Sequence, residues 1–252
     1  MTPRVSVVIP VYNEAEQITA CLDRIAESIA IPYEVLVVYD SMEDTTRPFV
    51  EAYSRTNPAV RGVLNSLGRG PAFAIRAGFD TATAPVAVVT MADGCDDPTQ
   101  IETLTRLVER GVVVAAASRY ARSGQQVGGP ALKGLMSRLA GLTLYWFARV
   151  GTRDATNSFK AYSTAFVDAA GIESDKGFEI GIELVAKARR ARLPVAEIPT
   201  IWLDRAFGVS NFKIAAWLPR YLHWYFYCFG PKKNLGTFTA LPLDLSRNGL
   251  EQ

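Results

Sequence analysis

The sequence has few of the residues that most often bind transition metals or act as general bases. It contains one histidine, His223, and three cysteines, Cys21, Cys95 and Cys228, among 252 residues. The cysteines are far apart, odd in number and without a C-x-x-C pair, which excludes a Cys₄ zinc site, argues against a disulfide framework and favours a reducing, cytoplasmic compartment. One histidine in an aromatic run argues against a Ser-His-Asp triad or a His-rich metal site. Catalysis must then use carboxylates, basic side chains, backbone groups or a hard metal ion.

Net charge and long apolar runs are also scarce. The 27 Lys and Arg residues nearly balance 25 Asp and Glu, which gives no indication of a nucleic-acid partner. No stretch offers about 20 apolar residues without a charge, so no transmembrane helix is expected. The apolar stretch after Arg4 is too short for a secretory signal. With 49% hydrophobic residues, the chain can bury a large core, and disordered, collagen and solenoid classes are excluded.

Apolar, β-branched runs alternate with amphipathic stretches along the first half of the chain. The expected strands are Val5–Val11, Tyr33–Tyr39, Val60–Leu64, Val86–Met91 and Val112–Ala117. The expected helices are a stretch capped by Asn13 and ending near Ile29, then Thr46–Thr56, Gly70–Ala82 and Pro98–Arg110. Strands that are apolar throughout are typical of a sheet buried on both faces. The alternation predicts the α/β class, with a doubly wound, mostly parallel sheet flanked by helices.

Polar side chains follow the strands at the points where each is expected to end. They are Asn13, Glu14, Asp40, Asp93, Asp96, Asp97, Ser118, Arg119 and Tyr120. Ligands bind beyond the carboxyl ends of the strands in such sheets. Residues of these types are also common in turns and caps, but four successive loops with this content favour a binding site. No G-x-G-x-x-G motif follows the first strand, which argues against a dinucleotide cofactor.

Three carboxylates, Asp93, Asp96 and Asp97, stand in one turn after the fourth expected strand. Carboxylates so close together repel one another unless a cation or basic groups hold them. Mg²⁺ or Mn²⁺ suits such a site, because these ions bind through one or two carboxylates and complete their shell with water and substrate phosphates. Asp97 precedes Pro98 and is expected to cap the next helix. The predicted metal ligands are therefore Asp93 and Asp96.

Five segments stand in order along the first half of the chain: SVVIPVYNEAEQI, VVYDSMEDTT, NSLGRGPAFAIRAGF, MADGCDDP and SRY. DATNSFKAY and EIPTIWLDRAFGVSNFK follow later. Together they resemble family 2 glycosyltransferases of the GT-A fold, and the later two are similar to those of dolichyl- and polyprenyl-phosphate sugar synthases. The resemblance covers about residues 5–213. It implies transfer of a sugar from a GDP- or UDP-sugar to a polyprenyl phosphate, with inversion at the anomeric carbon.

The resemblance also implies roles for individual residues. Those matched to donor nucleotide binding are Pro10, Tyr12, Glu14, Asp40 and Asp93. Those matched to the acceptor phosphate are Arg119, Lys133 and Ser137. Asp93, Arg119 and Arg205 are the implied catalytic residues, and Arg205 belongs to an element that closes over the donor.

Three positions depart from the family pattern. YDSM stands where DDGS is usual, so Asp40 alone remains of a pair of acids. Ala92-Asp93-Gly94 replaces the usual DxD, and Ser210-Asn211 replaces Ser-Lys, which removes a cation unless Lys213 substitutes for it.

Two apolar, aromatic segments lie in the second half, Ala131–Val150 and Ile214–Phe229. Their Trp and Tyr residues, next to Arg and Lys, are typical of amphipathic helices at a membrane interface. A core helix or an oligomer interface is the alternative for each segment. We expect a glycosyltransferase domain over residues 1–212 and an aromatic membrane-interface segment over 213–252, ending in a loose tail after Leu235. Peripheral attachment to the cytoplasmic face of a membrane is the predicted localisation.

Other functions remain open at this point. Glu179 and Glu183, four residues apart on an expected helix, provide a base if the acceptor is soluble, although such pairs more often face solvent or a basic partner. A sugar nucleotidyltransferase can share a similar nucleotide-binding sheet. A catalytically silent, membrane-docked partner subunit is the third alternative, because the metal-binding turn departs from the family pattern.

Overall fold

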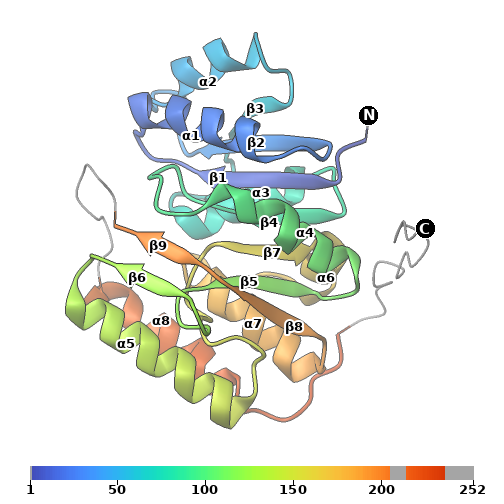
Figure 1. Ribbon diagram of the computed structural model, residues 1–252, viewed down its shortest axis with the longest axis vertical. Helices are drawn as coiled ribbons and strands as arrows, with labels where there is room; N and C mark the ends of the chain where they lie inside the picture. Colours follow the sequence, from blue (N-terminus) through green and yellow to red (C-terminus); the bar gives the residue numbers. More distant parts are fainter. Residues whose placement is uncertain (1, 205–213, 236–252) are drawn as a thin grey trace.

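The computed structural model describes residues 2–204 and 214–235. Its centre is a seven-stranded sheet of order β3-β2-β1-β4-β7-β5-β8 (Figure 1). Neighbouring strands are parallel except at β7, which is antiparallel to both β4 and β5. The strands are β1 Val5–Pro10, β2 Tyr33–Tyr39, β3 Val60–Leu64, β4 Val86–Val89, β5 Val114–Ser118, β7 Lys160–Ser163 and β8 Val195–Pro199, and β6 Gln125–Val127 pairs with β9 Ile201–Leu203 in a separate parallel sheet. The predicted α/β class and mostly parallel sheet are confirmed.

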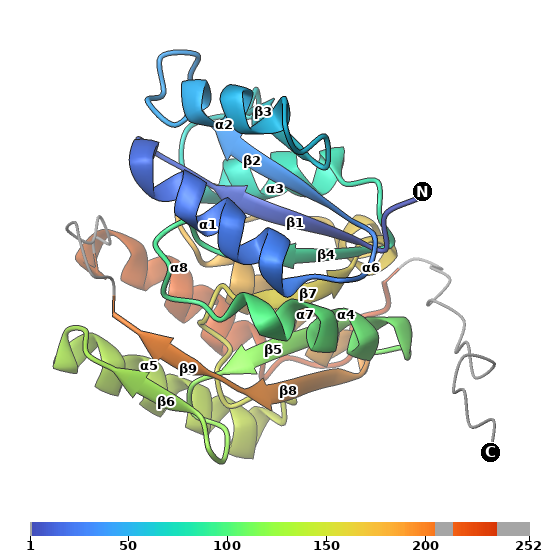
Figure 2. The same ribbon diagram turned by 45° about the horizontal axis from the view of Figure 1, so that its top comes forward.

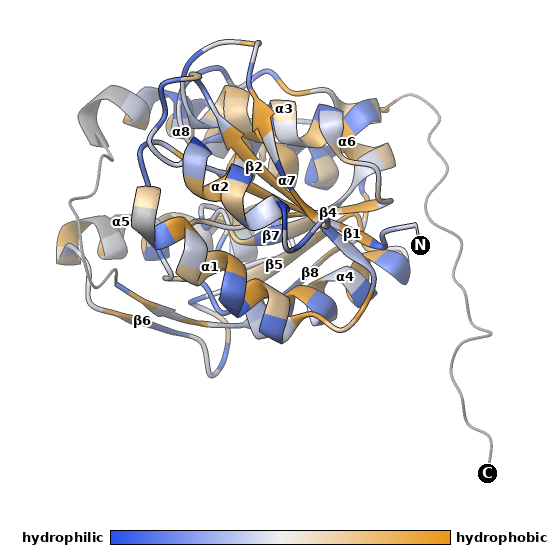
Figure 3. Ribbon diagram, turned by 90° about the horizontal axis from the view of Figure 1, so that it is seen from above, coloured by the Kyte–Doolittle hydropathy of each residue, from blue (hydrophilic) through white to orange (hydrophobic). Residues whose placement is uncertain are grey.

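Helices cover both faces of the sheet, which explains the uninterrupted apolar strands (Figures 2 and 3). One face is packed by α1 (Ala15–Ser28), α2 (Arg47–Ser54) and α4 (Ile101–Glu109), and the other by α3 (Pro71–Thr81), α6 (Thr164–Ala170) and α7 (Ile180–Ala191). Val7 and Ile9 of β1 pack with the first group and Val8 with the second, because successive side chains of a strand point to opposite faces.

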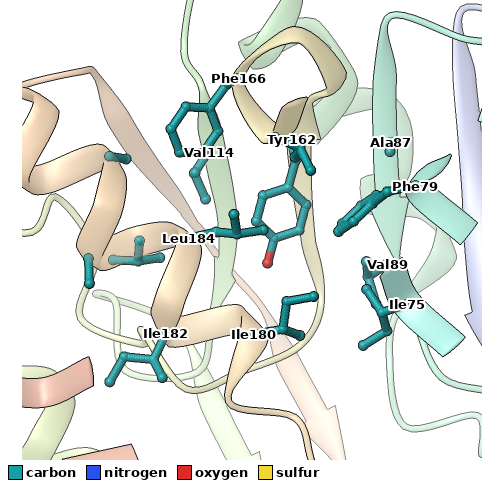
Figure 4. Packing of buried hydrophobic residues seen from close by; sticks show 14 of the residues in the cluster. Ile75, Phe79, Ala87, Val89, Val114, Tyr162, Phe166, Ile180, Ile182 and Leu184 are labelled. Carbon is teal, nitrogen blue, oxygen red and sulfur yellow. The ribbon is translucent and has the colours of Figure 1, made fainter. Parts of the chain in front are cut away.

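Strands β6, β7, β8 and β9 are not among the expected strands, and of these β7 lies in the middle of the central sheet. Tyr162 is fully buried between Leu184 of α7 and Phe79 of α3 (Figure 4), and its ring meets Phe79 edge-on with centroids 5.5 Å apart. Val89 of β4 and Ala116 of β5 are the register partners of Lys160. The end of β4, which precedes the Asp turn, and the end of β5, which precedes Arg119, therefore lie on either side of Lys160.

The predicted capping role of Asn13 is wrong. Helix α1 is preceded by Glu14, and no side chain caps it. Asn13 has φ of +56°, and its side-chain oxygen accepts a hydrogen bond from the Thr45 amide at 3.1 Å. Asn13 therefore connects the loop after β1 to the loop after β2. The cap expected at Asp97 is confirmed, since its Oδ1 accepts from the Thr99 amide at 3.0 Å.

Helix α5 (Ala131–Thr143), a π-helical turn (Leu144–Ala148) and α8 (Ile214–Tyr227) lie together at one side of the molecule (Figure 1). Tyr225 of α8 donates a hydrogen bond to Thr143 of α5 at 2.9 Å. Trp224 is buried in the core that α7 shares, so the core-helix alternative holds for that face of α8. No helix within the described ranges is long and apolar enough to cross a membrane. The boundary at 212–213 and the expected tail after Leu235 lie outside the described residues.

Candidate active site

The loops after β1 and β2 are bonded to each other at the carboxyl edge of the sheet. Asp44 accepts hydrogen bonds from the Asn13 amide on both carboxylate oxygens at 3.2 Å and from the Thr46 amide at 2.8 Å. The Glu14 amide donates to Thr46 Oγ1 at 2.9 Å. This network fixes the backbone amides of residues 13 and 14. Of the three residues matched to the nucleoside, Pro10 ends β1, Tyr12 is exposed beyond it and Glu14 directly precedes α1. Asp44, which the sequence analysis did not single out, is the organising side chain.

Asp40, at the end of β2, accepts hydrogen bonds on both of its oxygens. Asn65 Nδ2 donates to Oδ1 and the Gly70 amide donates to Oδ2, each at 2.7 Å. Gly70 has φ of +116°, and a Cβ there would lie 2.8 Å from the carbonyl oxygen of Lys176. Asp40 therefore fixes the turn that leads into α3, and this turn needs glycine.

The turn after β4 places two carboxylates close together. Asp96 is buried, and its Oδ2 accepts from Thr90 Oγ1 at 3.0 Å and from the Met91 amide at 3.3 Å. Asp93 Oδ1 accepts from the Cys95 amide at 3.1 Å. Arg24 of α1 supports the turn from below by donating to the carbonyl oxygens of Gly94 and Asp96. Burial, and then the charge of Asp93, raise the pKa of Asp96 to about 7.

These residues fit a hard divalent cation. No group of three or more His, Cys, Asp and Glu side chains among the described residues is arranged to hold a metal ion. Two neighbouring carboxylates are nevertheless the donor set that Mg²⁺ or Mn²⁺ uses when water and substrate phosphates complete the shell. Asp93 and Asp96 provide this pair, whereas Asp97 is engaged in its cap.

Arg119, immediately after β5, is held by a fully buried carboxylate. Its Nε and Nη2 donate to the two oxygens of Asp154 at 2.7 and 2.9 Å, and its amide donates to Asp154 at 3.1 Å. Burial alone would lower the pKa of Arg119, but Asp154 outweighs it and raises the pKa. Although burial opposes ionisation of Asp154, Arg119 keeps the pKa of that carboxyl below its usual value. The guanidinium is therefore charged and fixed in direction.

Ser137 of α5 meets Arg119, as the resemblance implies for the acceptor phosphate. Its Oγ accepts from Arg119 Nη2 at 3.2 Å and lies 2.6 Å from Thr156 Oγ1. Lys133 stands one helical turn before Ser137 on α5. Arg205 lies outside the described residues, directly after Asp204, whose carboxylate accepts from the Gly129 amide at 3.0 Å.

Glu179 and Glu183 are fully buried and do not face solvent. Glu179 accepts from the amides of Lys176 and Gly177 at 3.2 and 2.8 Å. Glu183 accepts from two amides of the same loop, those of residues 173 and 174, and pairs with Lys187 at 2.6 Å. The basic-partner reading thus holds for Glu183, and both carboxylates brace the loop before α7.

Sequence reasoning missed the contacts that tie Asp154, Thr156 and Lys160 to the site. The segment DATNSFKAY, which holds all three, contributed to the resemblance, but nothing in the spacing pairs Asp154 with Arg119, 35 positions away. A charged residue inside the apolar stretch FKAYS was the available signal for Lys160.

The chain is similar to known proteins over most of its length. Residues 6–169 match the family model described as glycosyl transferase family 2. Polyprenol monophosphomannose synthase of Mycolicibacterium smegmatis is 28% identical over 233 residues, which are 86% of this chain and 87% of that protein. Dolichol-phosphate mannosyltransferase of Pyrococcus furiosus is 29% identical over 218 residues, 83% of this chain and 59% of that longer protein.

A solved structure shares the fold. Glucosyl-3-phosphoglycerate synthase from Mycobacterium tuberculosis, in complex with Mn²⁺, UDP and glucosyl-3-phosphoglycerate, superposes with a TM-score of 0.66 at 16% identity, covering 92% of this chain and 81% of that one. The sheet and its covering helices are those of the GT-A fold, as the sequence resemblance implied. With its family match extending over most of the sheet and its polar loops, the chain belongs to glycosyltransferase family 2.

Proposed function

We propose that the protein transfers a sugar, mannose, from a nucleoside-diphosphate donor to a polyprenyl phosphate. One observation carries the proposal: Arg119 is held at the carboxyl edge of the sheet and contacts Ser137 on α5, and α5 carries an exposed apolar stripe. A lipid phosphate needs this combination of a directed cation for its headgroup and an apolar surface for its chain. The names of the two relatives support mannose and a polyprenol-type acceptor.

The proposed chemistry suits a site without a histidine base. A phosphate monoester is already anionic at neutral pH, so its oxygen attacks the anomeric carbon without prior deprotonation. The bond from that carbon to the donor diphosphate breaks with inversion, and negative charge develops on the leaving group. A bound Mg²⁺ or Mn²⁺ would neutralise that charge. Asp93 and Asp96 would hold the ion, Arg119 would orient the acceptor phosphate, and Arg205 would contribute a further cation.

Nucleotide binding is assigned to the loops after β1 and β2. Pro10, Tyr12 and Glu14 would line the nucleoside, because they stand at the end of β1 and in the loop whose amides at residues 13 and 14 are held by Asp44 and Thr46. Asp40 would shape the same pocket through the turn it holds, since both of its oxygens already accept hydrogen bonds within the chain.

We also propose peripheral attachment to an anionic membrane surface, on the cytoplasmic side. The surface that would meet the membrane, the α5–α8 face, is formed by α5, the π-helical turn and α8 with the residues just after it. Its exposed apolar side chains are Leu132, Leu135, Met136, Leu139, Trp146, Phe147, Leu222, Phe226 and Phe229. Residues 131–153 and 214–235 contain seven Lys and Arg residues and no Asp or Glu. Because the whole chain is nearly neutral, this segregation of positive charge favours an anionic lipid surface.

The transfer itself is tested by incubating the purified protein with labelled nucleotide sugars and a polyprenyl phosphate, with and without Mn²⁺. Label in the lipid fraction that depends on Mn²⁺ supports the proposal. Formation of a nucleoside triphosphate from pyrophosphate would indicate a nucleotidyltransferase instead. Nucleotide binding without turnover would indicate a silent partner subunit, and label on a soluble acceptor would move the assignment to that class.

Removing the two most exposed aromatic side chains of the π-helical turn, which follows α5, should weaken membrane binding. Trp146 and Phe147 are 67% and 75% exposed, and burying such a ring in lipid contributes about 1.5 kcal/mol or more. The variant with both replaced by serine should bind anionic vesicles at least about tenfold more weakly in co-sedimentation. Phe49→Ser on α2, away from the α5–α8 face, is the matched control. Equal sedimentation of the double variant and wild type would show that the α5–α8 face does not bind the bilayer.

Replacing Lys133 should affect the acceptor selectively. Lys133 precedes Ser137 by one turn on α5, and a charge-assisted contact to phosphate contributes roughly 1.5–3 kcal/mol, or ten- to a hundredfold. Lys133→Ala should therefore raise KM for polyprenyl phosphate by about this factor and leave KM for the donor nearly unchanged. Steady-state kinetics with each substrate varied in turn measures both constants. Weakened donor binding with normal acceptor binding would contradict the assignment.

A further inference from the structure

A lysine is buried in the central sheet directly beneath the candidate site. Lys160 opens β7 and is fully buried, with Val89 of β4 and Ala116 of β5 as its register partners on either side. The first of these strands leads to the Asp turn, and the second ends just before Arg119. Buried lysines are rare unless they are paired or have a specific task.

The amino group of Lys160 binds backbone carbonyls. Its Nζ donates to the carbonyl oxygen of Ala155 at 3.2 Å and to that of Asn157. Both belong to the segment 154–157, which also contacts the candidate site. Asp154 holds Arg119, Thr156 lies against Ser137, and Asn157 Nδ2 donates to the Ala117 carbonyl at 2.8 Å.

The pKa of Lys160 agrees with a position between the Asp turn and the Arg119–Asp154 pair. Burial lowers the pKa of Lys160 to about 7, opposed by the charges of Asp154 and then Asp96. Because the hydrogen-bond acceptors are carbonyl oxygens, the amine donates to them whether or not it carries the extra proton.

We infer that Lys160 is a positioning residue: it holds the segment 154–157 from below, and through Asp154 and Thr156 it fixes the direction of Arg119 and Ser137. The kinetic part of this inference rests on the proposed function, whereas the structural part does not. A second buried lysine, Lys187, offers the contrast. It donates to the Gly171 carbonyl at 3.0 Å and pairs with Glu183, and none of its bonds leads to Arg119.

Three variants of Lys160 separate positioning from general stability. Lys160→Met keeps most of the buried stem and removes both donors, and it should raise KM for polyprenyl phosphate about tenfold with KM for the donor unchanged. Lys160→Arg should restore part of the acceptor affinity, because a guanidinium can donate to both carbonyls. Lys160→Gln keeps a donating nitrogen on a shorter side chain and should fall between them. Lys187→Met, the matched control, should lower the thermal midpoint but leave both KM values unchanged.

Hydrogen–deuterium exchange provides a readout that needs no activity. In Lys160→Met the amides of residues 154–159 should exchange faster than in wild type, and in Lys187→Met they should not. An acceptor KM within about twofold of wild type, or unchanged exchange in this segment, would overturn the inference. If Lys160→Met does not fold, Lys160→Gln decides in its place, and wild-type behaviour of that variant overturns it. If the wild-type protein proves inactive on polyprenyl phosphate, the proposed function fails while the exchange comparison still decides the role of Lys160.

Discussion

Replacing Arg119 by alanine should lower kcat by roughly a hundred- to a thousandfold, the usual cost of losing a preorganised charge at the position where charge moves. The guanidinium is fixed by two hydrogen bonds to Asp154 and contacts Ser137 on α5. In the proposed reaction this guanidinium would meet both the acceptor phosphate and the diphosphate that leaves. A single-turnover measurement at saturating concentrations of both substrates reports the loss without a contribution from binding.

Two further variants identify the cause of that loss. Arg119→Lys keeps the charge but cannot reproduce the bidentate pair with Asp154, so its kcat should lie between those of wild type and Arg119→Ala. Arg106→Ala removes an exposed arginine that pairs with Glu102 on α4, and its kcat should equal that of wild type. If Arg119→Ala retained wild-type single-turnover rates in a folded protein, Arg119 would have no part in the chemistry.

Replacing Asp93 by asparagine should abolish the Mn²⁺-dependent part of donor binding. The turn presents Asp93 and Asp96 as its two closely spaced carboxylates, and a divalent ion held by one of them alone would lose several kcal/mol of charge stabilisation. Titration calorimetry with GDP or UDP in the presence of Mn²⁺ should show affinity reduced by about a hundredfold or more. Binding measured with a chelator present should be the same in both proteins.

Asp97 provides the matched control, because it is a carboxylate of the same turn with a different task. Its side chain caps the following helical turn through Thr99. Asp97→Asn should therefore leave nucleotide affinity in Mn²⁺ nearly unchanged. Equal affinities for Asp93→Asn and wild type would place the metal site elsewhere in the protein.

Most of the sheet could be predicted from the sequence because both of its faces are covered. Val5–Pro10 and Tyr33–Tyr39 carry apolar side chains on both faces of the sheet. Such runs indicate a buried parallel strand without reference to any distant residue. β7 could not be predicted in this way. It is four residues long, begins with a lysine and runs antiparallel between two strands distant in sequence, so its pairing depends on contacts that local pattern does not encode.

In the candidate site too, some residues could be located from local sequence pattern and others only from contacts between distant residues. Asp93, Asp96 and Arg119 stand where strands end, so sequence pattern located them at one edge of the sheet. Asn13, by contrast, has the residue type of a helix cap, yet its side chain binds the loop after β2. The buried carboxylate of Asp44, in the loop after the neighbouring strand β2, accepts from the Asn13 amide, and this contact between distant residues overrides the local capping preference.

The sequence by itself determined the fold class, the edge at which polar groups gather and the segregation of positive charge in the second half, because residue type, period and strand ends are local properties. Tertiary structure alone decided which of those groups are fixed. Arg119 is oriented by Asp154 and Ser137, Glu179 and Glu183 are turned inward to hold a loop, and Trp224 is buried whereas Phe226 is exposed. The direction of a side chain depends on the partner that folding brings to it, and a buried charge is stable only where that partner is present.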